Sequence, residues 1–257
     1  MYGRTFEEIS KSNKPQKISR AWGDIKYCVK HKKYKLTSFQ LNKDYCLSLR
    51  ISKTDQARLF LLNGQLIINI DGNYGVMQSN ESINLPENIS IDVVADEFSE
   101  FFIFSKNNLN EIKGSARIKA DKSEEREQSK EILYKNGDRT YDKREKYWGR
   151  IETIFSDEIA GKVMHIKKGI QGSLEYHLEK VEAYFIHSGK LSVGLRYGRA
   201  EDRSIILNAG ESFIIEPGTM HSRYGVTNCK VIEISTRDND TDSFLVTDGN
   251  LKISDKS

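Results

Sequence analysis

Short runs of apolar residues, or of alternating apolar and polar residues, recur along the whole chain, and Gly, Asn and Asp separate them. The first half contains SFQL, LSLRI, ARLFLL, QLIINI, SINL and FFIF, and the second half contains KVMHI, SLEYH, AYFIH, LSVGL, SIIL, SFIIE and KVIEIS. Runs of this length and pattern are typical of β-strands with one or both faces buried. Many short strands at regular spacing favour a sandwich or a small barrel. We therefore expect an all-β fold.

The two halves of the chain repeat one another. Three blocks of the first half match three blocks of the second half in the same order, and their apolar, Ser and Gly positions coincide. An internal repeat of this kind indicates duplicated structural units. We expect each copy to form its own barrel. The matching blocks are Trp22–Ile25 with Trp148–Ile151, Ser48–Gly64 with Ser173–Gly189, and Asn80–Ser105 with Gly210–Ser235.

A charge-dense segment, DKSEEREQSKEILYKNGDRTYDKREKY, separates the two copies, and its composition is permissive for a helix. We expect an N-terminal barrel in residues 1–115, a helical linker in residues 116–140 and a C-terminal barrel in residues 141–257. The segment after Ser235 is polar, and we expect it to wrap the surface or to fray.

The composition excludes several classes of function. The net charge of +3 is small for 257 residues, and Lys and Arg alternate with Asp and Glu, so the chain lacks the basic stripe of a nucleic-acid-binding protein. No apolar run approaches the length of a membrane span, and the first residues lack the apolar core of a signal peptide. We expect a cytoplasmic protein that binds neither nucleic acid nor membrane. Its three cysteines, Cys28, Cys46 and Cys229, lie far apart and are expected to be buried free thiols.

Ionisable side chains are concentrated between Gly169 and Gly189, in a chain with only five histidines. Glu175 and His177 are two residues apart on an extended run, so their side chains leave the same face of a strand. A short turn follows, and in an antiparallel pair Glu182 at the start of the next strand would lie beside His177. His221, at the end of the turn PGTMH, could add a fourth group. Two carboxylates and two imidazoles inside a barrel suit a divalent metal such as Fe, Mn, Zn, Ni or Co.

These residues fall at the spacings of the two cupin motifs, G-x5-H-x-H-x(3,4)-E-x6-G and G-x5-P-x-G-x2-H-x3-N. The chain resembles a two-domain bicupin. The resemblance implies two tandem jelly-roll barrels, a homodimer, and one divalent metal ion (Zn, Mn, Fe or Ni) held by Glu175, His177, Glu182 and His221. Glu175 stands where the family usually has a histidine, so it could be a ligand or a general base. The matching positions are Gly169, Glu175, His177, Glu182 and Gly189 in the first motif, and Gly210, Gly218 and His221 in the second, with Glu216 and Gly225 as departures.

The first copy serves as an internal control for this site. Opposite the four proposed ligands it has Arg50, Ser52, Ala57 and Ile91, although its glycine and apolar positions are retained. The barrel scaffold therefore does not itself require the ligand residues. We expect that the C-terminal barrel binds the metal and that the N-terminal barrel is structural or dimerising.

A narrower resemblance links the chain to mannose-6-phosphate isomerase-type cupins, through YWGR, SLEYHLEKVEAYFIHSG, IIEPGTMHS and VIEIST in that order. It implies an isomerase or epimerase that acts on a sugar or sugar phosphate. Glu175 or another barrel carboxylate is then the candidate base, and Arg223 or Arg196 would meet a phosphate. Tyr184 and Arg223 share the inward parity of Glu182 and His221 and could contact the substrate. The residues leave two other functions open: a non-haem iron or manganese dioxygenase of a small chelating substrate, and a non-catalytic sugar-binding bicupin.

Overall fold

The computed structural model describes residues 11–52, 56–109, 111–116, 142–199 and 202–249. They divide into two compact units: Gln16–Tyr141, and Asp142–Ser257 together with Met1–Pro15. Residues 11–15 are thus grouped with the C-terminal unit. Asn13 makes an isolated bridge to Ser212, with two backbone hydrogen bonds of 2.8 Å. Most of the predicted helical linker, residues 117–140, lies outside the described residues, and Ala116 ends a strand.

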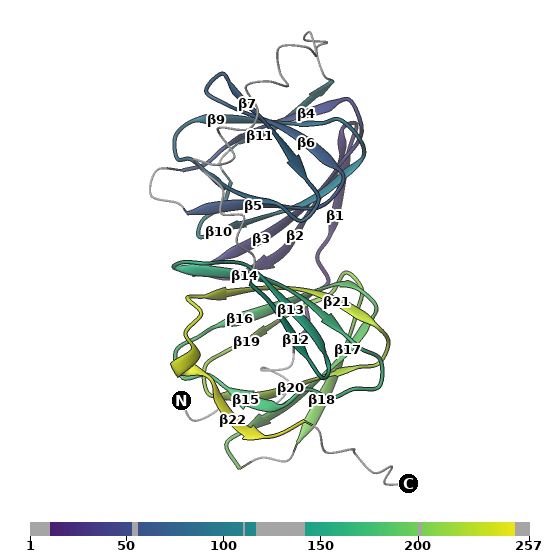
Figure 1. Ribbon diagram of the computed structural model, residues 1–257, viewed down its shortest axis with the longest axis vertical. Helices are drawn as coiled ribbons and strands as arrows, with labels where there is room; N and C mark the ends of the chain where they lie inside the picture. The colour runs from purple at the N-terminus through teal and green to yellow at the C-terminus, as the bar shows by residue number, and fades with distance from the viewer. Residues whose placement is uncertain (1–10, 53–55, 110, 117–141, 200–201, 250–257) are drawn as a thin grey trace. The chain divides into compact units, whose positions relative to one another are not determined.

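The N-terminal unit consists of two antiparallel sheets that face each other (Figure 1). The sheets have the strand orders β1-β2-β3-β10-β5-β8 and β11-β4-β9-β6-β7. Their inward side chains form one continuous apolar core that includes Leu49, Ala57, Ile91 and Phe101. The strands are β1 Lys17–Arg20, β2 Gly23–Lys30, β3 Lys35–Leu41, β4 Tyr45–Arg50, β5 Ala57–Asn63, β6 Gln65–Ile70, β7 Asn73–Gln78, β8 Ser82–Leu85, β9 Ser90–Ala95, β10 Ser99–Ser105 and β11 Glu111–Ala116.

The C-terminal unit is built in the same way, from sheets with the orders β12-β13-β14-β21-β16-β19 and β18-β17-β20-β15-β22 (Figure 1). Its six-stranded sheet matches that of the N-terminal unit strand by strand. A short 3₁₀ helix, η1 Asp240–Asp242, precedes the last strand. The strands are β12 Asp142–Lys146, β13 Gly149–Ser156, β14 Ile159–Ile166, β15 Leu174–Tyr176, β16 Glu182–Ser188, β17 Lys190–Tyr197, β18 Arg203–Asn208, β19 Ser212–Ile215, β20 Thr219–Gly225, β21 Cys229–Thr236 and β22 Phe244–Thr247.

The predicted all-β fold of two jelly-roll barrels is confirmed. All the strand pairs are antiparallel, and the predicted runs of both copies lie within strands or, as with SLEYH, overlap one. Among the described residues, no helix is long and apolar enough to cross a membrane. The three cysteines are free thiols as predicted, and Cys28 and Cys229 are buried.

The interior of the C-terminal barrel has an apolar end and a polar end. Inward residues of β14, β16 and β21 near one end are Met164, Ile186 and Val231, which belong to the apolar core. Two residues further along β14 and β21, the same face carries Lys162 and Glu233, which lie opposite each other in the β14–β21 register and are buried. Because strand side chains alternate between faces, this polar end faces into the barrel.

Candidate metal centre

Glu175 and His221 are direct neighbours, because β15 and β20 pair antiparallel with these two residues in register. Glu182 reaches the same place from the other sheet, since β16 pairs with β19 and β21. Our expectation that Glu182 and His177 share an antiparallel strand pair is therefore wrong. The turn between them crosses from one sheet of the barrel to the other, so the two residues face each other across the interior.

The structure brings all four predicted ligands together. Single ligand atoms of Glu175, His177 and His221 lie within 4.8 Å of one another. Oε1 of Glu182 lies 2.7 Å from Nε2 of His221, and its Oε2 lies 3.7 Å from Nε2 of His177. The imidazole centroids are 5.6 Å apart. His177, Glu182 and His221 are buried, whereas the Glu175 side chain is 21% exposed. Glu175 therefore marks the side of the centre that solvent and small molecules can reach.

Both histidines turn the same ring nitrogen toward the centre. Nδ1 of His177 lies 2.7 Å from the backbone oxygen of Asp242, and Nδ1 of His221 lies 3.1 Å from the backbone oxygen of Thr219. With Nδ1–H donating to these oxygens, Nε2 of each ring is the atom free to accept a ligand. Nε2 of His177 has no hydrogen-bond partner among the described residues, and Nε2 of His221 faces Oε1 of Glu182 at 2.7 Å. With Nδ1 protonated, each Nε2 is an acceptor that faces a carboxylate oxygen of Glu182, and a metal ion would satisfy both kinds of acceptor.

Asp242 fixes the turn that follows His177. Its carboxylate accepts backbone N–H bonds from Leu178 at 2.8 Å, Glu179 at 3.1 Å and Lys180 at 2.9 Å. Burial alone would raise the pKa of Asp242, but these backbone donors outweigh it and lower the pKa. The segment expected to wrap the surface or fray thus contributes a buried anchor to the site.

Glu182 is the most tightly held carboxylate of the centre. Its Oε2 lies 2.9 Å from Nζ of Lys180, and the hydroxyl of Tyr184 donates to Oε1 at 2.7 Å. Burial would raise the pKa of Glu182, yet the charge of Lys180 and the contact with His221 hold that pKa well below its ordinary value. Burial and the negative charge of Glu182 raise the pKa of Tyr184 well above 10, so its hydroxyl stays protonated as a donor.

Glu175 forms an ion pair with Arg223 inside the barrel. The Arg223 side chain is buried, and its guanidinium carbon lies 5.7 Å from the ring centroids of both Trp148 and Tyr184. These rings favour the cation and limit its movement. Arg223 therefore orients the Glu175 carboxylate, and the inward positions predicted for Arg223 and Tyr184 agree with the structure.

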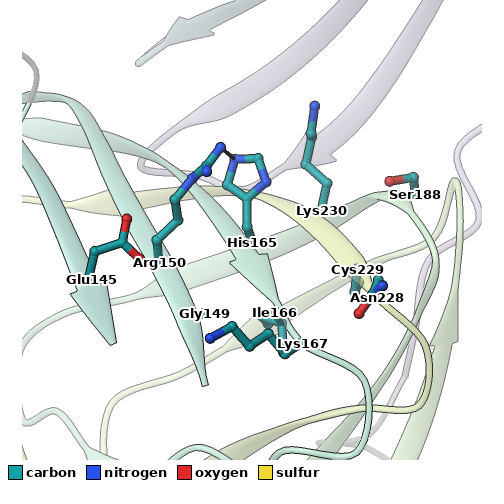
Figure 2. A pocket seen from close by; sticks show the side chains of 10 residues that line it. All are labelled: Glu145, Gly149, Arg150, His165, Ile166, Lys167, Ser188, Asn228, Cys229 and Lys230. Atoms are coloured by element: carbon teal, nitrogen blue, oxygen red, sulfur yellow. Dashed lines mark hydrogen bonds between the residues drawn. The ribbon is translucent and has the colours of Figure 1, made fainter. Parts of the chain in front are cut away.

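Arg196, predicted as a possible phosphate contact, lies away from the centre, and so does His165. Arg196 pairs with Asp202 at 2.5 Å and lines a separate pocket of about 420 Å³ on the outer face of β17 and β20. His165 lies on the outer face of β14, where Nε2 is 3.3 Å from Arg150 (Figure 2). His165 lines a second pocket, also of about 420 Å³, together with Arg150, Lys230 and other residues. None of the four proposed metal ligands lines this pocket.

Sequence reasoning missed the charged groups beneath the ligands. The sequence places Lys180 in a short turn and assigns no role to Lys162, Glu233 or Asp238. The available signal was a charged residue in the middle of an apolar strand, as in AGKVMHI and KVIEIS. Such a residue is costly to bury without a partner, so two of them in neighbouring strands indicate a buried ion pair.

The described residues of the N-terminal barrel contain no comparable cluster. Ala57 and Ile91 lie in its apolar core, and Arg50 is exposed. Within the described residues, Glu175, His177 and His221 form the one group of three or more His, Cys, Asp or Glu side chains with metal-binding geometry.

No protein-family model matches the chain, and no curated protein matches its sequence. Solved structures do match it. An oxalate decarboxylase of Bacillus subtilis, studied for its Mn(II) centres, has a TM-score of 0.70 and 11% identity over 95% of this chain and 81% of its own. A formate complex of Lactobacillus farciminis oxalate decarboxylase has a TM-score of 0.69 and 12% identity, over 90% of this chain and 86% of its own. These structures give no support to the narrower resemblance to mannose-6-phosphate isomerases. What the chain shares with them is the two-barrel cupin fold.

Proposed function

We propose that the C-terminal barrel is the active site of a metal-dependent enzyme that isomerises or epimerises a sugar or sugar phosphate. The observation that carries the proposal is that ligand atoms of Glu175, His177 and His221 lie within 4.8 Å of one another and that both histidines are buried. The N-terminal barrel has the same scaffold without these residues, so the cluster is not a structural requirement of the fold.

The donor set fits one divalent ion of borderline hardness, which Glu175, His177, Glu182 and His221 would hold. Zn, Mn, Fe and Ni are all compatible, and the structurally similar oxalate decarboxylase has Mn(II) centres. When bound, such an ion would act as a Lewis acid that polarises a carbonyl oxygen and its neighbouring hydroxyl.

The side chains of the barrel supply the proton transfer. Moving a carbonyl between neighbouring carbons requires a group that takes a proton from one carbon and returns it to the other. Glu175 is the partly exposed carboxylate of the centre, and Arg223 holds its orientation. Tyr184 is fully buried and donates to Glu182, so its contribution is to orient that ligand. Arg223 also offers the positive charge that an anionic group of the substrate would meet.

The test combines metal content with proton exchange. We expect the purified protein to contain about one divalent ion per chain by elemental analysis, and to incorporate deuterium next to the carbonyl of its substrate in D₂O, followed by NMR on a panel of aldoses, ketoses and their phosphates. His177→Ala should lose both properties, and His187→Ala, which alters a histidine outside the cluster, should retain them. Absence of metal from the gently prepared protein would refute the proposal.

A second candidate is a non-haem iron or manganese dioxygenase. Two histidines and one carboxylate, here His177, His221 and Glu175, are the ligand type of many oxygen-activating iron enzymes. Oxygen uptake after anaerobic reconstitution with Fe(II) separates the two functions, because an isomerase consumes no oxygen. Oxalate with Mn(II) belongs in the same screen, since two of the structurally similar proteins are oxalate decarboxylases.

Two further expectations stay proposals. A metal-loaded protein that binds a sugar without turnover would be a sugar-binding bicupin and not an enzyme. The homodimer that the cupin resemblance implies can be measured by sedimentation of the purified chain.

A further inference from the structure

A chain of buried ion pairs extends from Glu182 away from the metal centre. Lys180 Nζ lies 2.9 Å from Oε2 of Glu182, 3.0 Å from Oε1 of Glu233 and 3.3 Å from Oδ1 of Asp238. At the end of the chain of ion pairs away from Glu182, Lys162 Nζ lies 2.7 Å from Oδ2 of Asp238 and 3.8 Å from Oε1 of Glu233. The network thus contains three carboxylates and two ammonium groups, and Lys180 is the member that joins it to a metal ligand.

Lys180 forms an ion pair with one carboxylate oxygen of Glu182, and the other oxygen faces the proposed metal site. Oε2 contacts the Lys180 ammonium, whereas Oε1 receives the Tyr184 hydroxyl and lies 2.7 Å from Nε2 of His221. The position of Lys180 is itself fixed, because its backbone N–H donates to Asp242 and its side chain is only 6% exposed. A buried ammonium with three carboxylate partners has little freedom to move.

In the described part of the N-terminal barrel, the positions of Lys162, Glu182 and Glu233 are occupied by uncharged residues. The strand pair Lys162 and Glu233 corresponds to Thr37 and Ile103, which lie opposite each other in the β3–β10 register. Glu182, which pairs with Ser235, corresponds to Ala57, which pairs with Ser105. A barrel of the same topology is therefore formed without the buried charges. Burying them costs free energy, so their presence beside the ligands indicates a role at the centre.

We propose that Lys180 is a positioning residue that holds Glu182 as a one-oxygen metal ligand and is itself braced by Glu233, Asp238 and Lys162. This inference rests on the proposed metal site. A partner that contacts the outer oxygen of a ligating carboxylate fixes its orientation and typically contributes 10- to 100-fold to metal affinity. A purely electrostatic role would act in the opposite sense, because an ammonium repels a cation and its removal would tighten metal binding.

The test compares Lys180→Met with Lys162→Met, using Mn(II) alone as the probe. Both variants remove one buried ammonium from the network, but only Lys180 contacts Glu182. We expect the Mn(II) affinity of Lys180→Met to fall about 10- to 100-fold, with an altered low-temperature EPR spectrum because Glu182 can rotate and bind through both oxygens. Lys162→Met should retain the wild-type spectrum and an affinity within about threefold of wild type. Unchanged or tighter binding in Lys180→Met, or an equal loss in both variants, would overturn the proposal.

Metal-free crystal structures of the same variants keep this test separate from the proposed function. We expect the Glu182 carboxylate to leave its contact with His221 in Lys180→Met and to keep it in Lys162→Met. A wild-type protein that binds no metal would refute the proposed function, while the orientation of Glu182 would still decide the role of Lys180. If Lys180→Met does not fold, Lys180→Gln replaces it, because the amide retains a donor without charge. A smaller loss of Mn(II) affinity is then expected, and no loss would overturn the proposal.

Discussion

Asp242 holds His177 and the turn after it through two groups, its backbone oxygen and its side-chain carboxylate. Nδ1 of His177 lies 2.7 Å from the Asp242 backbone oxygen, and the Asp242 carboxylate binds the backbone of the residues that follow His177. The ring orientation therefore depends on a segment more than sixty residues later in the chain. Asp242 belongs to the short helix η1, so the position of this helix sets the direction in which Nε2 points.

Replacing Asp242 with Ala should weaken both the fold and the metal site. Three backbone N–H groups lose a charged acceptor, and hydrogen bonds of this type contribute about 1.5–3 kcal/mol. We expect a drop of that order in the free energy of unfolding, measured with urea, and a metal affinity reduced about 10-fold or more. Thr241→Ala is the control, because its hydroxyl donates only to Asn239 at the protein surface. Equal effects of the two substitutions would contradict the role given to Asp242.

Replacing Glu175 with Gln should separate metal binding from turnover. The amide oxygen of Gln can occupy the position of the carboxylate oxygen, so we expect metal affinity within about tenfold of wild type. The amide cannot accept a proton, and loss of a general base lowers turnover about 10²- to 10⁴-fold. Metal content and deuterium incorporation measure the two properties. Glu175→Leu should lose the metal as well. A Gln variant with full turnover would exclude Glu175 as the base.

Much of the fold and the ligand set could be predicted from the sequence, for a physical reason. Strand alternation determines which residues share a face, so Glu175, Arg223 and Tyr184 were placed inward without knowledge of the topology. The spacing of short motifs then located His177, Glu182 and His221. The duplicated scaffold added a comparison within one chain, which showed that these residues are not needed to form a barrel.

Strand partners and long-range contacts were beyond the sequence. Inward and outward side chains alternate in the same way along β15 and β16 whether these strands pair with each other or lie in opposite sheets. The sequence therefore predicts the wrong strand partner for Glu182. Asp242 contacts His177 through its backbone oxygen, and any residue type can supply that atom. Lys180 lies in a turn, where a charged side chain is ordinarily solvated, and its burial depends on three carboxylates contributed by other strands and by the C-terminal segment.

Acid should remove the stabilisation that Asp238 provides. Burial would raise the pKa of Asp238, but Lys162 and Lys180 outweigh it and hold that pKa below 3.8. A carboxylate with a lowered pKa stabilises the fold above the unfolded-state value, and this stabilisation is lost as the pH falls through the folded-state value. The difference in unfolding free energy between wild type and Asp238→Asn should therefore be constant from about pH 7 to 5 and shrink below about 3.8.

Urea denaturation in the presence of a chelator, at several pH values, measures this difference without a contribution from bound metal. Asp202→Asn is the matched control, because Asp202 is exposed and its ion pair with Arg196 lies at the surface, where solvent screens it. A difference for Asp238→Asn that stays constant down to about pH 3 would show that the ion pairs with Lys162 and Lys180 do not stabilise the fold.

Replacing Tyr184 with Phe should alter the metal ligand without changing the acid–base chemistry. The substitution removes the donor to Oε1 of Glu182 and retains the ring beneath Arg223. Because burial raises the pKa of Tyr184 well above 10, its hydroxyl does not ionise near neutral pH and cannot act as the base. We expect metal affinity to fall severalfold, in the manner of other groups that orient ligands, while the pH dependence of turnover by the metal-saturated enzyme keeps the same midpoints. A shifted midpoint in the pH–rate profile would instead place Tyr184 in the proton transfer.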